Sequence, residues 1–213
     1  MRNLVSVDVF SDTICPWCYI GFKKLNDALA NFNNNKFDIV WRPFQLNPNM
    51  PSGGMDRQQY LTTKFGSKEN ARYVYQRIED EGKKNKIFFQ FNKITKTPNS
   101  FLSHKLLAYA HKKNKQTEVL ELLFYKYFIE GEDVGNLKVL INVSKNGDIY
   151  DENIENYIIS NHDNDSLLNE EKQAKNIGVY SVPCFIFNKE IVVNGAQSTK
   201  KFIQIIDSLN RDV

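Results

Sequence analysis

The sequence contains few cysteines and few histidines, three of each among 213 residues. A disulfide-rich framework is therefore excluded. No stretch reaches the ~18 apolar residues that a membrane helix requires, so no membrane partner is expected. The net charge is only +3, and the lysines alternate with acidic and amide residues instead of forming a basic stripe. Without such a stripe or an RNA-binding signature, no nucleic-acid partner is expected.

A secretory leader pattern is also missing. The segment MRNLVSVDVF passes directly into strand-like alternation, whereas a leader has a longer apolar region followed by a small-residue cleavage site. The sequence therefore predicts a cytoplasmic protein. In that compartment stable disulfides are uncommon, and a close cysteine pair is more often catalytic or metal-binding.

Two of the three cysteines, Cys15 and Cys18, lie in the segment SDTICPWCYIG. Pro16 and Trp17 separate them, and the apolar spacing that follows predicts a helix from about Pro16 to Asn31. A cysteine at a helix start meets free N–H groups and the positive end of the helix dipole, which stabilise its thiolate. The spacing then favours a redox pair, with Cys15 as nucleophile and Cys18 as resolving thiol.

Two other interpretations of the pair stay open. A metal site needs more ligands, but there is no second Cys-x-x-Cys and no suitably spaced pair among His104, His111 and His162; no metal is expected. Two unreactive thiols at a helix start are the other alternative. The third cysteine, Cys184, falls in a predicted strand where alternation directs it into the core.

The order of elements predicts an α/β protein. Alternation over Val5, Val7 and Val9, the helix after Cys15, and the strand FDIVWRPF form a βαβ unit. Helical patterns then continue to about residue 176. The end, VPCFIFNKEIVVNG followed by STKKFIQIIDSL, reads as a hairpin and a helix. We therefore expect a first domain from residues 1–47 and 177–213, interrupted by an all-helical insertion at 48–176.

Pro183 opens a predicted strand, where a proline needs a special reason. In a βαβ–ββα arrangement that strand lies beside the first one and places Pro183 opposite Cys15. A cis Val182–Pro183 bond would turn the backbone groups of Val182 outward, where they would pair with an extended substrate.

The motifs together resemble the DsbA family of thioredoxin-fold proteins, in its FrnE-like cytoplasmic branch. They are SDTICPWCYIG, TPNSFLSHKLL, LFYKYFIEGEDVG and GVYSVPCFIFN…VNGAQS. The resemblance implies a thioredoxin fold with a large helical insertion, a redox-active Cys15–Cys18 pair and a cis-Pro183. The sister group with this fold, glutathione transferase kappa and 2-hydroxychromene-2-carboxylate isomerase, has a serine at the position of Cys15 and binds glutathione.

Four more residues are candidates for the site. Asp12 is the nearest carboxylate to the cysteines and a candidate for proton handling, because the buried acid of relatives is replaced by Val9. Asn99 and His104 are candidates for substrate binding because they match an asparagine and a histidine of the sister group, and His104 would lie over the sulfur of Cys15. Gly195 is expected in the loop beside Pro183, where a missing side chain admits substrate.

The expected activity is thiol–disulfide exchange, by reduction or isomerisation, on protein or small-molecule disulfides. No cofactor is expected beyond the Cys15–Cys18 disulfide, with glutathione as a candidate co-substrate. The uncharged Trp17 predicts an intermediate potential. Alternatives are a glutathione-dependent isomerase or transferase acting on a small aromatic substrate, and a chaperone-like binding protein. The sequence is compatible with a monomer or a homodimer.

Overall fold

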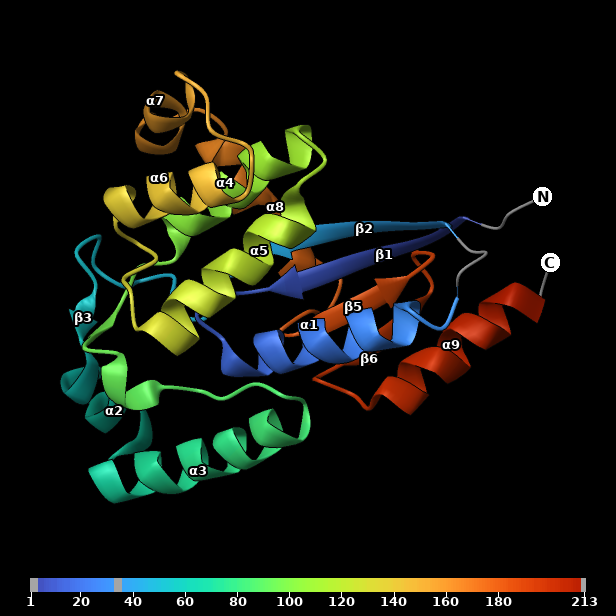
Figure 1. The fold of residues 1–213 in the computed structure, drawn as a ribbon, viewed down its shortest axis with the longest axis horizontal. Coiled ribbons are helices and arrows are strands. Elements are labelled where there is room, and N and C mark those ends of the chain that lie inside the picture. The colour runs from blue at the N-terminus through green and yellow to red at the C-terminus, as the bar shows by residue number, and fades with distance from the viewer. Residues whose placement is uncertain (1–3, 33–35, 212–213) are drawn as a thin grey trace.

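The protein is organised around a mixed four-stranded sheet with the strand order β2-β1-β5-β6 (Figure 1). This computed structural model describes residues 4–32 and 36–211. The strands are β1 (Leu4–Ser11), β2 (Lys36–Pro43), β5 (Cys184–Phe187) and β6 (Ile191–Asn194). β1 and β2 are parallel, whereas β5 is antiparallel to both β1 and β6. The N-terminal strands β1 and β2 therefore join the C-terminal strands β5 and β6 where β1 pairs with β5.

Helices α1 (Pro16–Leu29) and α9 (Thr199–Arg211) lie side by side against the sheet (Figure 1). Val5, Val7 and Val9 of β1 are buried in the same hydrophobic cluster as the apolar side chains of both helices. The first residue of α1 is a proline, whose missing N–H costs nothing at that position. The predicted βαβ…ββα order, and with it the thioredoxin fold class, is confirmed.

The long segment between the two halves is helical, as expected, except for a two-residue antiparallel ladder between β3 and β4. Two paired residues are too few for alternation to show in a sequence. The elements are β3 (Met55–Asp56), α2 (Arg57–Phe65), α3 (Lys68–Lys84), a 3₁₀ turn (Phe91–Lys93), β4 (Lys96–Thr97), α4 (Phe101–Lys112), α5 (Gln116–Tyr125), a π-helical turn (Lys126–Glu130), α6 (Leu137–Asn146), α7 (Ile154–Ile159) and α8 (Asn164–Asn176).

One hydrophobic cluster joins the sheet to the inserted helices. Leu25 of α1, Leu106 of α4, Phe124 of α5 and Phe185 of β5 all belong to it and are fully buried. Burying each such side chain contributes about 1.5–3 kcal/mol. The proposed division at residues 47/48 and 176/177 separates the sheet-forming sequence from the helical sequence but does not divide this cluster, so the domain boundaries stay a prediction.

A second, smaller cluster contains the third cysteine. Cys184 is fully buried with Phe10, Phe44, Ala174 and Ile186. Burial raises the pKa of the Cys184 thiol to about 11. Cys184 and the two paired cysteines thus belong to different hydrophobic clusters, as strand alternation predicts.

The outer edge of β2 is closed by a side chain. The amide of Gln116 accepts a hydrogen bond from the backbone N–H of Trp41 and donates one to its carbonyl, both at 2.9 Å. The indole N–H of Trp41 also donates to the hydroxyl of Thr117 at 2.9 Å. These bonds attach the start of α5 to the strand and satisfy backbone groups that an edge strand leaves unpaired.

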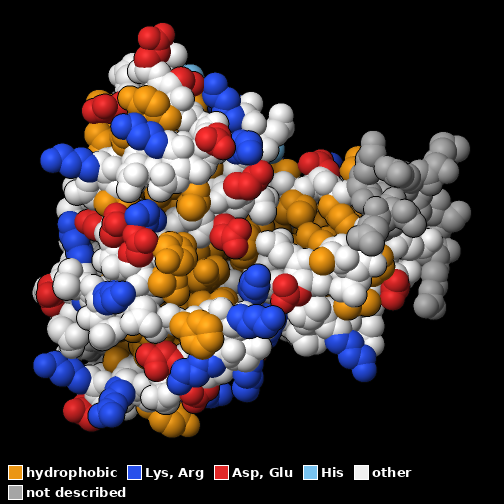
Figure 2. All heavy atoms as spheres, viewed as in Figure 1, with side chains coloured by type: hydrophobic (Ala, Val, Ile, Leu, Met, Phe, Trp, Pro, Cys, Tyr) orange, Lys and Arg blue, Asp and Glu red, His pale blue; other side chains and the backbone are white. Residues whose placement is uncertain are grey.

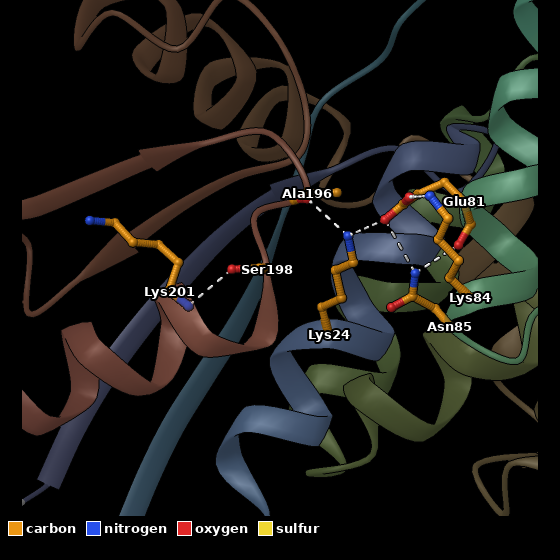
Figure 3. A network of polar contacts seen from close by, with 7 residues as sticks. All are labelled: Lys24, Glu81, Lys84, Asn85, Ala196, Ser198 and Lys201. Carbon is orange, nitrogen blue, oxygen red and sulfur yellow. Dashed lines mark hydrogen bonds and ion pairs between the residues drawn. The ribbon is translucent and has the colours of Figure 1, made fainter.

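A lysine on α1 connects three parts of the fold (Figure 3). Lys24 is only 8% exposed, and its Nζ donates to Glu81 of α3 at 2.7 Å and to the carbonyl of Ala196 at 3.4 Å. Ala196 lies in the loop before α9, where Ser198 caps the helix by accepting from the N–H of Lys201. Lys24 therefore positions both α3 and that loop relative to α1.

The surface carries charges of both signs. On the face shown in Figure 2, basic and acidic side chains are interspersed, with hydrophobic side chains between them. None of the helices in the described part of the chain has the length and apolarity that crossing a bilayer requires.

We expect Lys24→Met to lower the free energy of unfolding by about 1 kcal/mol at pH 7, because Glu81 then loses a partly buried ionic hydrogen bond. The hydrogen bond from Lys24, followed by that from Lys84, holds the pKa of the Glu81 carboxyl below its usual value. A lowered folded-state pKa stabilises above the unfolded pKa and loses that effect as pH falls through the folded value. Urea unfolding should therefore show the difference between wild type and variant shrinking below about pH 4.5.

Lys84→Met is the matched control, since Lys84 also pairs with Glu81, at 3.2 Å, but its side chain is 72% exposed. It should change the free energy of unfolding by less than about 0.5 kcal/mol. Equal losses in the two variants would contradict the role given to Lys24.

Candidate functional site

Cys15 is the N-cap residue of α1. Its backbone is extended, with φ −93° and ψ 114°, and its carbonyl accepts from the N–H groups of Cys18 and Tyr19. Its own N–H donates to the carbonyl of Asp12 at 3.0 Å. This geometry places the side chain at the positive end of the helix. Cys15 is 4% exposed, and the neighbouring Trp17 is 38% exposed.

Cys18 lies one turn further along α1 and is 1% exposed. Burial raises the pKa of the Cys18 thiol well above its usual value, and hydrogen bonding to Cys15 and the charge of Cys15 raise it further. The hydroxyl of Ser11 and the backbone of Asp12 act in the opposite direction. Both cysteines are free thiols in this structure. The pair thus combines a thiol at a helix end with a deeper thiol that stays protonated.

The loop before β5 meets the first cysteine. The Val182–Pro183 peptide bond is cis, and the carbonyl of Val182 accepts from the sulfur of Cys15 at 3.8 Å, across 167 positions of sequence. The N–H of Gly195 donates to the carbonyl of Pro183 at 2.8 Å. Gly195 has a φ of +76°, and nothing lies within 4 Å of where its Cβ would be. The fold therefore gathers Cys15, Val182, Pro183 and Gly195 at one place.

Gly21, which the sequence reading missed, allows this approach. A Cβ at Gly21 would lie 3.1 Å from Cγ of Pro183 and 3.0 Å from Cζ of Phe185. Gly21 is three residues after Cys18, so it lies on the same face of α1 one turn later. The spacing Cys-x-x-Cys-x-x-Gly is the signal that identifies it: the helix needs a residue without a side chain where the proline loop packs on it.

Asp12 is buried directly before the dithiol. Its Oδ2 accepts from the N–H of Leu46 at 2.7 Å and its Oδ1 from the N–H of Ile14 at 3.3 Å. The carboxylate thereby joins the loop that leads to Cys15 to the chain segment that follows β2. These contacts give Asp12 a positioning role, and its role in proton handling stays a prediction.

His104 of α4 is buried beside Asp12. Its Nε2 lies 3.6 Å from Oδ1 of Asp12 and has no hydrogen-bond partner within the described residues, the sulfur of Cys15 included. The expectation that His104 lies over that sulfur stays a prediction. The adjacent Ser103 shares a 2.7 Å hydrogen bond with Thr13, which turns this side of α4 toward the loop before Cys15.

Asn99 joins the start of α4 to the chain segment that follows β2. Its side-chain carbonyl accepts from the N–H of Phe101 at 2.9 Å and from Gln45 at 3.2 Å, and its NH₂ donates to the carbonyl of Met50 at 2.7 Å. The amide is thus engaged within the chain at both ends. Its expected role in substrate binding stays a prediction.

No group of three or more His, Cys, Asp or Glu side chains is arranged to hold a metal ion in residues 4–32 and 36–211.

Of the aromatic residues in the segment IFFQF, Phe89 is buried and Phe91 packs against it with ring centroids 4.8 Å apart. Phe88 is 65% exposed. Two of the three rings therefore serve the core.

A thioredoxin fold with a Cys-x-x-Cys pair at the start of α1, facing a cis-proline, defines a thioredoxin-like protein of the thiol–disulfide class. A family model, the DSBA-like thioredoxin domain, matches residues 6–207. The chain therefore belongs to the DSBA-like thioredoxin domain family, and the resemblance of its motifs to the DsbA family is confirmed, while the FrnE-like branch stays a prediction.

Known proteins similar to this chain are distant in sequence. YwbO of Bacillus subtilis, described as uncharacterized, is 23% identical over 66% of this chain, and the match spans 65% of YwbO, slightly less than two thirds. The probable DsbA oxidoreductase SCO1869 from Streptomyces coelicolor has a TM-score of 0.87 at 23% identity, covering 96% of this chain and 89% of that one. The cytosolic disulfide reductase DsbM from Pseudomonas aeruginosa, solved also with GSH, has a TM-score of 0.69 at 15% identity, covering 98% and 100%. These structures share the fold.

We expect Gly21→Val to lower both stability and activity. The added side chain would push Pro183 and Phe185 away from α1, at a cost of about 2 kcal/mol in the free energy of unfolding. Displacing the proline loop from Cys15 should slow disulfide exchange by about tenfold. Urea unfolding and an insulin-reduction assay measure the two effects. Gly53→Val, at a position where a Cβ meets nothing within 4 Å, is the control and should leave activity unchanged.

Proposed function

We propose that this protein is a thiol–disulfide oxidoreductase that uses the Cys15–Cys18 dithiol to reduce or isomerise protein or small-molecule disulfides. One observation supports this most strongly: the sulfur of Cys15, at the start of α1, lies 3.8 Å from the carbonyl of Val182. A helix start stabilises a thiolate. The backbone of Val182 beside it, just before β5, is proposed to pair with an extended substrate.

In the proposed reaction the thiolate of Cys15 attacks one sulfur of a substrate disulfide. The S–S bond breaks, a mixed disulfide forms at Cys15, and the departing thiolate takes up a proton. Cys18 then loses its proton and attacks the sulfur of Cys15, releasing the second substrate thiol. The substrate gains two electrons and two protons, and the enzyme is left with a Cys15–Cys18 disulfide. Two thiols of a reductant such as glutathione would regenerate the dithiol.

The supporting residues have distinct proposed roles. The backbone of Val182 pairs with the substrate, and Gly195 leaves room for it beside Pro183. Asp12 and His104 form a buried pair behind the dithiol and are proposed to take up or return the proton of Cys18. Trp17 adds no charge between the cysteines, which favours reduction or isomerisation over strong oxidation. This role suits a cytoplasmic protein of the FrnE-like branch, and the similar DsbM, a cytosolic reductase solved with GSH, supports glutathione as co-substrate.

Cysteine variants test the assignment. We expect Cys15→Ser to abolish insulin reduction, because no thiol is then left at the helix start. Cys18→Ser should retain the attack by Cys15 but accumulate a mixed disulfide, visible by mass spectrometry as an adduct that a reductant removes. Cys184→Ser is the control that removes a thiol belonging to the other hydrophobic cluster, and it should keep most of the wild-type activity.

Full insulin reduction by Cys15→Ser would refute the proposal. Glutathione-dependent turnover of an aromatic substrate that survives Cys18→Ser would favour the isomerase or transferase alternative. Suppression of aggregation that survives loss of both thiols would favour a binding protein.

The raised pKa of Cys18 predicts selective alkylation of the reduced protein. At pH 7 iodoacetamide should modify Cys15 first, because burial keeps Cys18 protonated and the thiolate is the reactive form. Peptide mapping of the alkylated protein measures the order. Modification of Cys18 before Cys15 would contradict the assigned roles.

A further inference from the structure

Tyr19, the residue after Cys18 on α1, is nearly buried, and its hydroxyl has no partner within the described chain. The residue is 9% exposed. Its ring stacks on Phe124 with centroids 5.0 Å apart and on Phe128 at 6.1 Å. Within residues 4–32 and 36–211 the hydroxyl makes no hydrogen bond. A largely buried tyrosine normally pairs its hydroxyl, so this hydroxyl is available to a bound molecule.

The hydroxyl of Tyr19 faces a cleft of about 530 Å³ that follows α5. Because the two phenylalanines hold the ring in the core, the hydroxyl is the end of the side chain that lines the cleft. Burial, then the charges of Glu121 and Tyr125, raise the pKa of Tyr19 to about 12. Glu121 and Tyr125 line the same cleft, so the hydroxyl of Tyr19 points toward them.

The cleft has an excess of negative charge. Its charged lining consists of three acidic residues and one basic residue, which are Glu118, Glu121, Asp148 and Lys115. Lys115 lies 3.8 Å from Glu118, whereas neither Glu121 nor Asp148 takes part in an ion pair among the described residues. We call the set Tyr19, Glu118, Glu121, Tyr125 and Asp148 the acidic cleft. Carboxylates beside tyrosine rings attract a cation both by their charge and by the faces of the rings.

The acidic cleft adjoins the dithiol through α1. Tyr19 lies four residues after Cys15, and its N–H donates to the carbonyl of Cys15 at 3.3 Å. Side chains four residues apart lie on the same face of a helix, one turn apart, and lean toward its N-terminus. An extended chain covers ~3.3–3.6 Å per residue. A polypeptide whose sulfur reacts at Cys15 therefore reaches the cleft within a few residues.

The shape of the cleft favours a segment of polypeptide over a small ion. Along α5 its lining extends from Lys115 to Tyr125, which at 1.5 Å per residue is a length of about 15 Å. No group of His, Cys, Asp or Glu side chains in the described part of the chain is arranged to hold a metal ion. The three acids are exposed, so a basic side chain meets them without losing all of its water.

We propose that the acidic cleft binds a basic side chain of a disulfide-containing polypeptide, a few residues away from the cysteine that reacts with Cys15. The inference rests on the proposed oxidoreductase function and specifies its substrate class. The ammonium or guanidinium group donates to the hydroxyl of Tyr19 and to Glu121, and the other acids attract it at longer range. The cleft contributes binding and leaves the exchange of sulfur atoms unchanged, so the preference is expected in KM more than in kcat.

Disulfide peptides that differ in one charge test the proposal. The probes are the disulfide-linked dimers of acetyl-Cys-(Gly)n-Lys-amide and acetyl-Cys-(Gly)n-Gln-amide with increasing numbers of glycines. Each rate is divided by the rate of the same peptide with dithiothreitol. We expect wild type to prefer the lysine peptide by about fivefold in kcat/KM at the spacing that reaches Tyr19, since ionic hydrogen bonds discriminate by that order. The preference should decline as salt rises.

Two variants remove single groups from the cleft. Glu121→Gln should lower the lysine preference to less than about twofold, because the carboxylate nearest the Tyr19 hydroxyl is lost. Tyr19→Phe keeps the ring that packs on Phe124 and should lower the preference by about half. Glu190→Gln is the matched control. It removes one exposed acid in the turn between β5 and β6, at the end of β5 remote from Pro183, and should keep the wild-type preference.

Equal corrected rates for the lysine and glutamine peptides at every spacing would overturn the inference while insulin reduction continues. An equal loss of preference in Glu121→Gln and Glu190→Gln would overturn it as well, because the loss would then reflect the overall charge of the protein. If wild type reduces neither peptide nor insulin, the proposed function fails and not merely its substrate class.

Discussion

The close packing of the start of α1 against the loop that contains Pro183 is the constraint on which the site depends. Gly21 permits it, since a side chain there would lie 3.1 Å from the proline ring. The hydrogen bond from the sulfur of Cys15 to the carbonyl of Val182 shows how closely the helix start and the proline loop approach each other. The pairing of β5 with β1 brings the two segments together. A helix start alone provides a reactive thiol; the adjacent backbone turns that thiol into part of a binding site.

The inserted helices complete the surroundings of the dithiol. α3 is joined to α1 through Lys24 and Glu81, and α4 brings His104 beside Asp12. α5 contributes Glu121, which lines the acidic cleft together with Tyr19. The insertion shares its hydrophobic cluster with α1 and the sheet, so its positions relative to the cysteines are fixed by packing. The inserted helices thus surround the dithiol with side chains that the sheet, α1 and α9 do not provide.

Local patterns in the sequence predicted the four strands of the main sheet, the helix after Cys15, the hairpin near the end of the chain and the separate location of Cys184, because alternation, helical spacing and caps are short-range signals. Contacts between residues far apart in the sequence could not be predicted from such local patterns. On α4, the polar Ser103 and His104 are buried together with Leu106, Leu107 and Ala110, since α5, α6, α7, α8 and β2 all pack on this helix. The grouping of Tyr19 with the acids of α5 in one cleft is likewise a three-dimensional property that spacing does not encode.

The amide of Gln116, which occupies the backbone groups of Trp41, has a consequence for self-association. A sheet grows when a foreign strand docks along an unprotected margin, and at Trp41 on the β2 margin the backbone groups are already taken by a residue of the same chain. A second chain could pair with Trp41 only by displacing Gln116. Replacing Gln116 would therefore remove one obstacle to self-association through β2.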